Sequence, residues 1–130
     1  MTQREFIQFL TDLPEEKMKA ELIKAFTERY GESEEEIMMI ASPARINIIG
    51  EHIDYNGGKV FPAAIDRYLY VLLRKRYDTT IIYDDIRFPG ALEFSSTETF
   101  CYRRENQYAN YLNGMLAMMQ KEGYTLTSGF

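Results

Sequence analysis

Four side chains that could bind a ligand or take part in catalysis lie within ten residues of the sequence: Arg45, Glu51, His52 and Asp54. His52 is the only histidine of the chain. Carboxylates accept hydrogen bonds and an imidazole can donate or accept, so such a group can bind several hydroxyls of one small molecule. Each carboxylate that accepts from a hydroxyl contributes about 1.5–3 kcal/mol. The pattern predicts a site for a small polyhydroxylated ligand, with Arg45 as the electrostatic partner of a transferring phosphoryl group or of a catalytic carboxylate.

Other interpretations of this segment are weaker. A Glu-His-x-Asp string on a surface loop is often only solvated. A calcium loop that starts at Asp54 needs a glutamate at its twelfth position, where this chain has Ile65. One histidine and one cysteine, Cys101, are too few for a zinc site, so we expect no metal ligands. The ordered string, rather than any single residue, favours ligand binding.

The elements that must position this segment begin with two helices in the first thirty residues. Thr2 and Glu5 have the spacing of a capping box, and Pro14 suits the first turn of the second helix. Gly31 is placed to end that helix in a left-handed conformation. The second helix carries a stripe expected to face the core: Met18, Leu22, Phe26 and Tyr30.

From Ile37 onward the periodicity becomes that of β-strands. Pro43 is expected to break the first strand, and the segment 67–73 is apolar on both faces, which is typical of a central strand covered on both sides. The pair Asp78-Thr79 predicts a turn and a hairpin at 80–83, and Pro89-Gly90 predicts another turn. The expected strands cover 37–41, 46–49, 60–64, 67–73, 80–83 and 91–94.

A third helix is expected over 105–122, with Gly123 at its end. Its predicted buried face consists of Tyr108, Tyr111, Leu112, Met115 and Met119. The order of helices, strands and a further helix indicates an α+β domain.

The composition limits the functional classes. The net charge of −5 argues against nucleic-acid binding, and no apolar run approaches the roughly 18 residues of a membrane span. A single cysteine excludes an intramolecular disulfide and suits a reducing compartment. We therefore expect a cytoplasmic protein without nucleic-acid or membrane partners.

The segment Ser42–Gly58, SPARINIIGEHIDYNGG, resembles the galactokinase signature of the GHMP small-molecule kinases. The similarity continues through 59–66 and includes the helix end at 26–31. Ala44 stands where the family usually has glycine, and Ile53 where it often has threonine. Both flank the polar residues without replacing them.

This resemblance implies an α+β fold with a mixed β-sheet packed with helices, the N-terminal domain of the GHMP kinase fold (ribosomal protein S5 domain 2-like). It also implies roles for the polar residues. Glu51, His52 and Asp54 would bind galactose hydroxyls, and Arg45 would act as the catalytic residue near the reacting hydroxyl.

A second segment, Tyr108–Gly114, resembles the W-x-N-Y-x-K-G helix start of the family, whose aromatic residues lie beside the adenine of ATP. Tyr108 replaces the tryptophan and Asn113 replaces the lysine. The resemblance places Tyr108 and Tyr111 near adenine, and a tyrosine can still stack on a base. As an alternative, both are ordinary core aromatics.

The phosphate loop of the family, P-x-G-x-G-L-S-S-S-A, does not occur in this sequence, and neither does any other glycine-rich phosphate cradle. We therefore expect residues 1–130 to be one partial N-terminal domain, truncated, with the C-terminal domain absent. Alone, these residues are predicted to be inactive, to bind no cofactor tightly and to self-associate through an uncovered sheet face.

The resemblance implies a parent enzyme that uses ATP with Mg²⁺ to phosphorylate α-D-galactose at its anomeric hydroxyl. Two alternatives stay open: a galactokinase-like transcriptional regulator that senses galactose, and a GHMP kinase for a related sugar such as N-acetylgalactosamine or arabinose.

Overall fold

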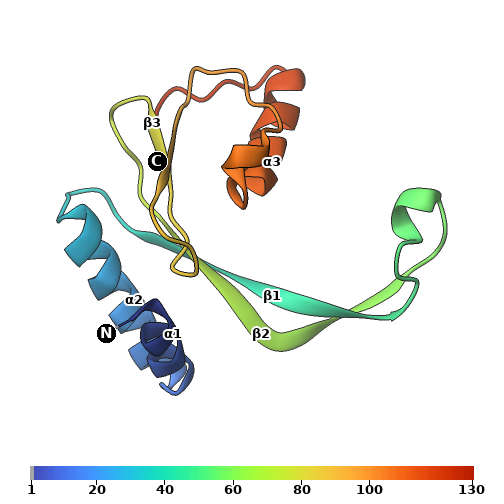
Figure 1. The fold of residues 1–130 in the computed structure, drawn as a ribbon, viewed down its shortest axis with the longest axis horizontal. Helices are drawn as coiled ribbons and strands as arrows, with labels where there is room; N and C mark the ends of the chain where they lie inside the picture. The colour runs from blue at the N-terminus through green and yellow to red at the C-terminus, as the bar shows by residue number, and fades with distance from the viewer. Residues whose placement is uncertain (1) are drawn as a thin grey trace. The chain divides into compact units, whose positions relative to one another are not determined.

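The computed structural model describes residues 2–130 and confirms the α+β class (Figure 1). The chain divides into two units, each described by itself below. The larger unit combines residues up to Glu36 with Arg74–Phe130, and the ribbon unit is Ile37–Leu73. The elements are α1 (Gln3–Thr11), α2 (Glu15–Tyr30), β1 (Met38–Ile49), β2 (Phe61–Leu73), β3 (Thr80–Tyr83), β4 (Leu92–Ser95) and α3 (Ala109–Lys121), with 3₁₀ turns at Asp54–Asn56 and Arg104–Asn106. No helix of residues 2–130 is long and apolar enough to cross a bilayer.

The capping box at the start of α1 is confirmed. The Glu5 amide donates to Thr2 Oγ1 at 3.2 Å, and the Thr2 amide donates to Glu5 Oε2 at 2.7 Å. Pro14 precedes α2 as its N-cap. Gly31 ends α2 with a φ of 76° and a ψ of 168°, so the positive φ is confirmed but the residue is extended rather than left-handed helical.

The core of the larger unit lies between the antiparallel pair β3–β4 and helix α3. Four residues are buried there, Ile81, Tyr83, Phe100 and Ala109, with partly buried side chains packed around them, among them Leu92, Leu116, Leu126 and Phe130. The last residues run along β3, because the Ile82 amide donates to the Phe130 carbonyl at 3.0 Å. A Cβ on Gly129 would lie 1.8 Å from the Thr80 carbonyl oxygen, so only glycine permits this approach.

Helix α3 begins at Ala109 rather than at 105, and its predicted buried face is wrong. Tyr111 is 85% exposed, and Leu112, Met115 and Met119 are also exposed. The buried side carries Ala109 and Asn113 instead. Gln120 fixes this orientation, since its Oε1 accepts from the Phe100 amide at 3.1 Å and its Nε2 donates to the Glu98 carbonyl at 2.7 Å. A helix that is apolar on several sides does not show by periodicity alone which side packs.

The hairpin expected at 80–83 has a different partner. β3 pairs antiparallel with β4, so that Ile81 lies opposite Phe94, and not with the strand that precedes it. The predicted turn at Pro89-Gly90 is confirmed by the φ of 79° at Gly90, just before β4. The turn residues were recognisable in the sequence, but the pairing partner was not.

In the ribbon unit, β1 pairs antiparallel with β2. Each is one long strand where the sequence predicted two, and Pro43 does not break β1. The register shifts between Pro43 and Arg45, which accommodates a residue that cannot donate to the ladder. The prediction of a central strand covered on both faces is wrong for residues 2–130, because β2 pairs only with β1 and Leu69 is 55% exposed.

The end of α2 is tied to two other segments of the larger unit. The Tyr30 hydroxyl donates to Asp84 Oδ2 at 2.5 Å, and Arg29 forms an ion pair with the same carboxylate. The Arg74 guanidinium donates to the carbonyls of Tyr30 and Gly31 and lies over the Phe26 ring. Since these contacts join residues distant in sequence, they hold the end of α2 against Arg74, which precedes β3, and against Asp84, which directly follows β3.

Burial raises the pKa of Tyr30, which also donates to Asp84, to about 12, and burial raises the pKa of Tyr83 to about 12. A tyrosine in the unfolded chain titrates near pH 10, so deprotonation favours unfolding above that value. We expect the contribution of these two tyrosines to the free energy of unfolding to be constant below about pH 10 and to be lost between pH 10 and about 12. Urea unfolding followed by circular dichroism at a series of pH values checks this. Between pH 10 and about 12, the free energy of unfolding should fall less in Tyr30→Phe than in the control Tyr124→Phe. Equal losses in the two variants would contradict the assignment to Tyr30.

Candidate functional site

The four polar residues of the signature segment all lie in the ribbon unit. Arg45 is in β1 opposite Ala64 of β2, and Glu51 and His52 follow in the turn after β1. Asp54 opens the 3₁₀ turn Asp54–Asn56. All four side chains are exposed. The structure therefore places three of them on one short loop and Arg45 on the strand that leads into it.

Three glycines shape this loop. Gly50 has a φ of 102°, and a Cβ on it would lie 2.9 Å from Val60 Cα, so the backbone at the base of the loop lies close to Val60. Gly57 has a φ of 78°, a conformation that glycine adopts at little cost. A Cβ on Gly58 would lie 1.9 Å from Ile53 Cγ2, so a side chain there would displace Ile53. The backbone of the loop thus favours glycine at positions 50 and 57.

His52 is held by two neighbours on the same loop. Its φ of 59° is unusual for a residue with a side chain. The Asn56 side-chain amide donates to the His52 carbonyl at 2.7 Å, which stabilises that conformation. On the other side, His52 Nδ1 lies 2.6 Å from the Tyr55 hydroxyl. Sequence reasoning missed Tyr55, although its spacing of three residues from His52 on a 3₁₀ turn was a usable signal.

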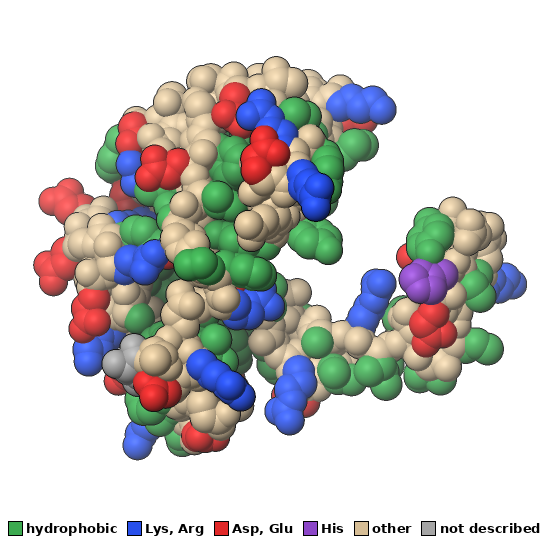
Figure 2. All heavy atoms as spheres, in the orientation of Figure 1, with side chains coloured by type: hydrophobic (Ala, Val, Ile, Leu, Met, Phe, Trp, Pro, Cys, Tyr) green, Lys and Arg blue, Asp and Glu red, His purple; other side chains and the backbone are tan. Residues whose placement is uncertain are grey.

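The side chains of Arg45, Glu51 and Asp54 make no hydrogen bond or ion pair within residues 2–130. The arginine ion pairs found there involve Arg29, Arg76 and Arg87. Figure 2 shows the imidazole beside an acidic side chain on the surface of the loop. A guanidinium, two carboxylates and an oriented imidazole, all facing solvent, can donate to and accept from several hydroxyls. No group of three metal-ligating side chains occurs in the described part of the chain.

The two tyrosines predicted near a nucleotide lie in the larger unit and have different surroundings. The Tyr108 ring stacks on Phe88, with centroids 4.9 Å apart and an interplanar angle of 18°, and its hydroxyl donates to the Tyr83 carbonyl at 3.0 Å. Burial, followed by the nearby Asp84 charge, raises the pKa of Tyr108. Tyr111 is exposed. Tyr108 is therefore a half-buried residue that packs against Phe88, whereas the ring of Tyr111 is exposed to solvent.

Asn110, which sequence reasoning did not single out, fixes the chain before α3. Its Nδ2 donates to the Arg103 carbonyl at 2.8 Å and to the Gln107 carbonyl at 3.1 Å, and its Oδ1 accepts from the Arg103 amide at 3.1 Å. These bonds stabilise a turn in which Gln107 has a φ of 43°. The asparagine of the Tyr-Ala-Asn-Tyr string thus has a structural role.

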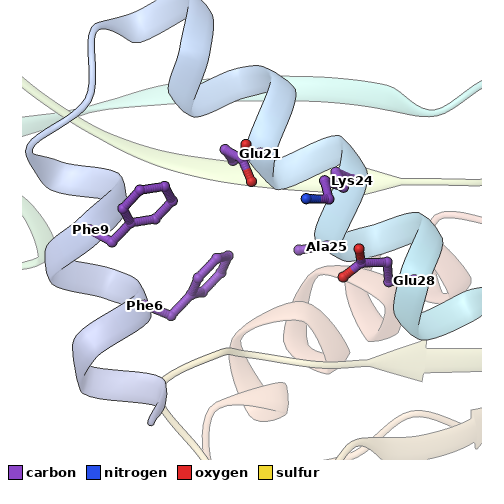
Figure 3. A pocket seen from close by; sticks show the side chains of 6 residues that line it. All are labelled: Phe6, Phe9, Glu21, Lys24, Ala25 and Glu28. Carbon is purple, nitrogen blue, oxygen red and sulfur yellow. The ribbon is translucent and has the colours of Figure 1, made fainter. Parts of the chain in front are cut away.

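A cavity of about 380 Å³ lies between α1 and α2, and none of the predicted site residues lines it. The rings of Phe6 and Phe9 point from α1 toward α2, where charged side chains line the other wall (Figure 3). The lining residues on α2 are Glu21, Lys24, Ala25 and Glu28.

Comparison with known proteins decides the family. Residues 24–75 match a family model described as the galactokinase galactose-binding signature. The chain is 38% identical over 107 residues to a galactokinase from Clostridium beijerinckii, covering 81% of this chain and 27% of that protein. It is 45% identical over 91 residues to a galactokinase from Staphylococcus carnosus, covering 68% of this chain and 23% of that protein. The chain belongs to the galactokinase family.

A solved structure agrees with this assignment. The crystal structure of Lactococcus lactis galactokinase complexed with galactose matches with a TM-score of 0.73 and 38% identity, over 85% of this chain and 28% of that one. The chain thus spans about a quarter of the length of these galactokinases and matches their N-terminal part. The family model covers Arg45, Glu51, His52 and Asp54 but ends before Tyr108 and Tyr111.

Proposed function

We propose that this chain supplies the galactose-binding part of an enzyme that transfers the γ-phosphoryl group of ATP to the anomeric hydroxyl of α-D-galactose, giving galactose 1-phosphate and ADP. The observation that carries the proposal is the galactose-binding signature, which spans the exposed residues Arg45, Glu51, His52 and Asp54. The similar L. lactis galactokinase was solved with galactose, which supports the same ligand here.

In this proposal Glu51, His52 and Asp54 bind the sugar hydroxyls. Carboxylates that accept from specific hydroxyls reject an epimer strongly, because a misplaced hydroxyl leaves them unpaired. Arg45 has no acidic partner in the described residues, so its charge is available to stabilise the phosphoryl group during transfer. The loop presents the hydroxyl-binding groups, and β1 presents the arginine.

The nucleotide site is only partly represented. One face of the Tyr108 ring is occupied by Phe88, whereas the exposed ring of Tyr111 can stack on a base. Mg²⁺ supplies charge neutralisation when it is bound with ATP, but no set of three acidic or histidine ligands lies within residues 2–130. We therefore propose that the phosphate loop and the catalytic aspartate come from polypeptide outside these residues, in a C-terminal part that is not included in this chain.

The 130-residue polypeptide alone is expected to show no galactose-dependent release of ADP, because phosphoryl transfer depends on positioning the phosphates. A coupled ADP assay with purified chain, ATP, Mg²⁺ and galactose checks this, with L. lactis galactokinase as the positive control. Turnover above the galactose-free background would contradict the expectation.

The relatives reported above are named galactokinase, which favours phosphorylation over a purely sensing role. A competition panel of galactose, N-acetylgalactosamine and arabinose tests the specificity of the full-length protein. A cytoplasmic location fits this proposal, since ATP is the phosphoryl donor and Cys101 is a free thiol.

We also propose that the chain self-associates through the ribbon. Large apolar side chains of both strands are exposed, among them Met38, Ile46, Leu69 and Val71. A two-stranded sheet with an uncovered apolar face is only marginally stable by itself. Light scattering at increasing concentration should therefore report species larger than 15.3 kDa. A constant monomeric mass at high concentration would refute the proposal.

A further inference from the structure

We propose that Tyr55 is a positioning residue for His52: its hydroxyl donates to Nδ1 of the imidazole, so that Nε2–H is the group presented to the sugar. This inference rests on the proposed galactose-binding role of His52. It adds a residue that the sequence did not point to, and it assigns the imidazole one tautomer.

The geometry carries the inference. The Tyr55 oxygen lies 2.6 Å from His52 Nδ1, and the two ring centroids are 6.0 Å apart at 65°, so the contact is edge-on through the hydroxyl. Tyr55 sits in the middle of the 3₁₀ turn Asp54–Asn56, which brings its side chain back to the residue three positions earlier. Both side chains are exposed, so this hydrogen bond, rather than burial, restricts the imidazole.

The backbone supports the same orientation. His52 has a φ of 59°, a conformation that is costly for a residue with a side chain. At the other end of the turn, the side-chain amide of Asn56 donates to the His52 carbonyl at 2.7 Å and holds the backbone in this conformation. With the backbone held by Asn56 and the ring held by Tyr55, little freedom is left for the imidazole.

The direction of the hydrogen bond follows from the two groups. A phenol is a good donor, and a neutral imidazole has one nitrogen that accepts and one that donates. If Nδ1 accepts from Tyr55, the proton is on Nε2. The outward nitrogen then donates to a hydroxyl oxygen, while the carboxylates of Glu51 and Asp54 accept from hydroxyl protons. The three side chains would thus recognise hydroxyls by complementary hydrogen bonds.

The single histidine of the chain makes a direct test possible, because ¹⁵N-labelled histidine gives signals from one imidazole only. The spectra of the unsubstituted chain, Tyr55→Phe and the matched control Tyr102→Phe are compared without ligand at about pH 8.5, where histidine is neutral. Tyr102 is likewise exposed, and it lies outside the ribbon unit.

The unsubstituted chain and Tyr102→Phe should show the proton on Nε2, and Tyr55→Phe should show a mixture of both tautomers with averaged nitrogen signals. The backbone amide spectrum shows whether each variant is folded, and Tyr55, which is 71% exposed, contributes little to packing. Identical imidazole signals in the unsubstituted chain and Tyr55→Phe, or a proton on Nδ1 in the unsubstituted chain, would overturn the proposal.

A galactose titration of the same samples separates this proposal from the proposed function. If the chain binds galactose, Tyr55→Phe should raise the Kd about three- to tenfold, and Tyr102→Phe should leave it unchanged. An unchanged Kd in Tyr55→Phe would refute the positioning role. If galactose moves no signal in the unsubstituted chain, the galactose-binding proposal fails, and the ligand-free spectra still decide whether Tyr55 fixes the tautomer.

Discussion

The Asp54→Ala variant of the protein that contains this chain is expected to have a galactose KM about 10- to 100-fold higher than the unsubstituted protein. The reason is that a carboxylate that accepts from a hydroxyl contributes about 1.5–3 kcal/mol to binding. The Asp54 side chain is exposed and has no hydrogen bond within residues 2–130, so its removal should leave stability nearly unchanged. Steady-state kinetics at saturating ATP measure KM, and thermal unfolding measures stability.

The matched control is Asp66→Ala, which removes another exposed carboxylate, in β2 of the same unit. Its galactose KM should stay within twofold of the unsubstituted value, because Asp66 lies outside the loop. An unchanged KM in Asp54→Ala, or equal increases in the two variants, would remove Asp54 from the site. The comparison separates a specific contact from the general effect of removing one carboxylate from the ribbon.

The second large effect concerns stability. Ile81→Ala should lower the free energy of unfolding by about 2–5 kcal/mol, since a buried isoleucine is lost and a cavity is left. Ile81 is 0% exposed, lies in β3 opposite Phe94, and belongs to the same cluster as Tyr83, Phe100 and Ala109. Urea unfolding followed by circular dichroism measures the change.

Ile46→Ala is the matched control at a dilution where light scattering reports a monomer, because the same side chain is truncated in β1 where it is 50% exposed. Its expected cost is below about 1 kcal/mol. Similar losses in the two variants would mean that the ribbon is buried in solution and that the core of the larger unit is not the main source of stability.

Features set by neighbouring residues were predictable from the sequence. The capping box of Thr2 and Glu5, the positive φ of Gly31 and the turn at Gly90 each depend on local chemistry. Sheet pairing depends on distant residues, so the hairpin assigned to 80–83 had the wrong partner. The face of α3 was also predicted wrongly, because Tyr111 and Met115 made the longer apolar stripe while small Ala109 allowed the closer packing.

The candidate site follows the same division. Arg45, Glu51, His52 and Asp54 could be grouped by sequence because they are close in the chain, and the structure places them on one strand and its loop. The contact of Tyr55 with His52 depends on the 3₁₀ turn, which the sequence pattern did not indicate. Whether the four residues bind galactose remains a proposal.

The closed base of the loop has an evolutionary consequence. Gly50 lies close to Val60 and to the Lys59 carbonyl, so the two ends of the loop meet at a contact that involves no side chain of residues 51–58. Substitutions between the two ends can change the preferred stereoisomer while the supporting scaffold stays as it is. Divergence of specificity within such a family is therefore expected to concentrate inside this short loop and to spare its two ends.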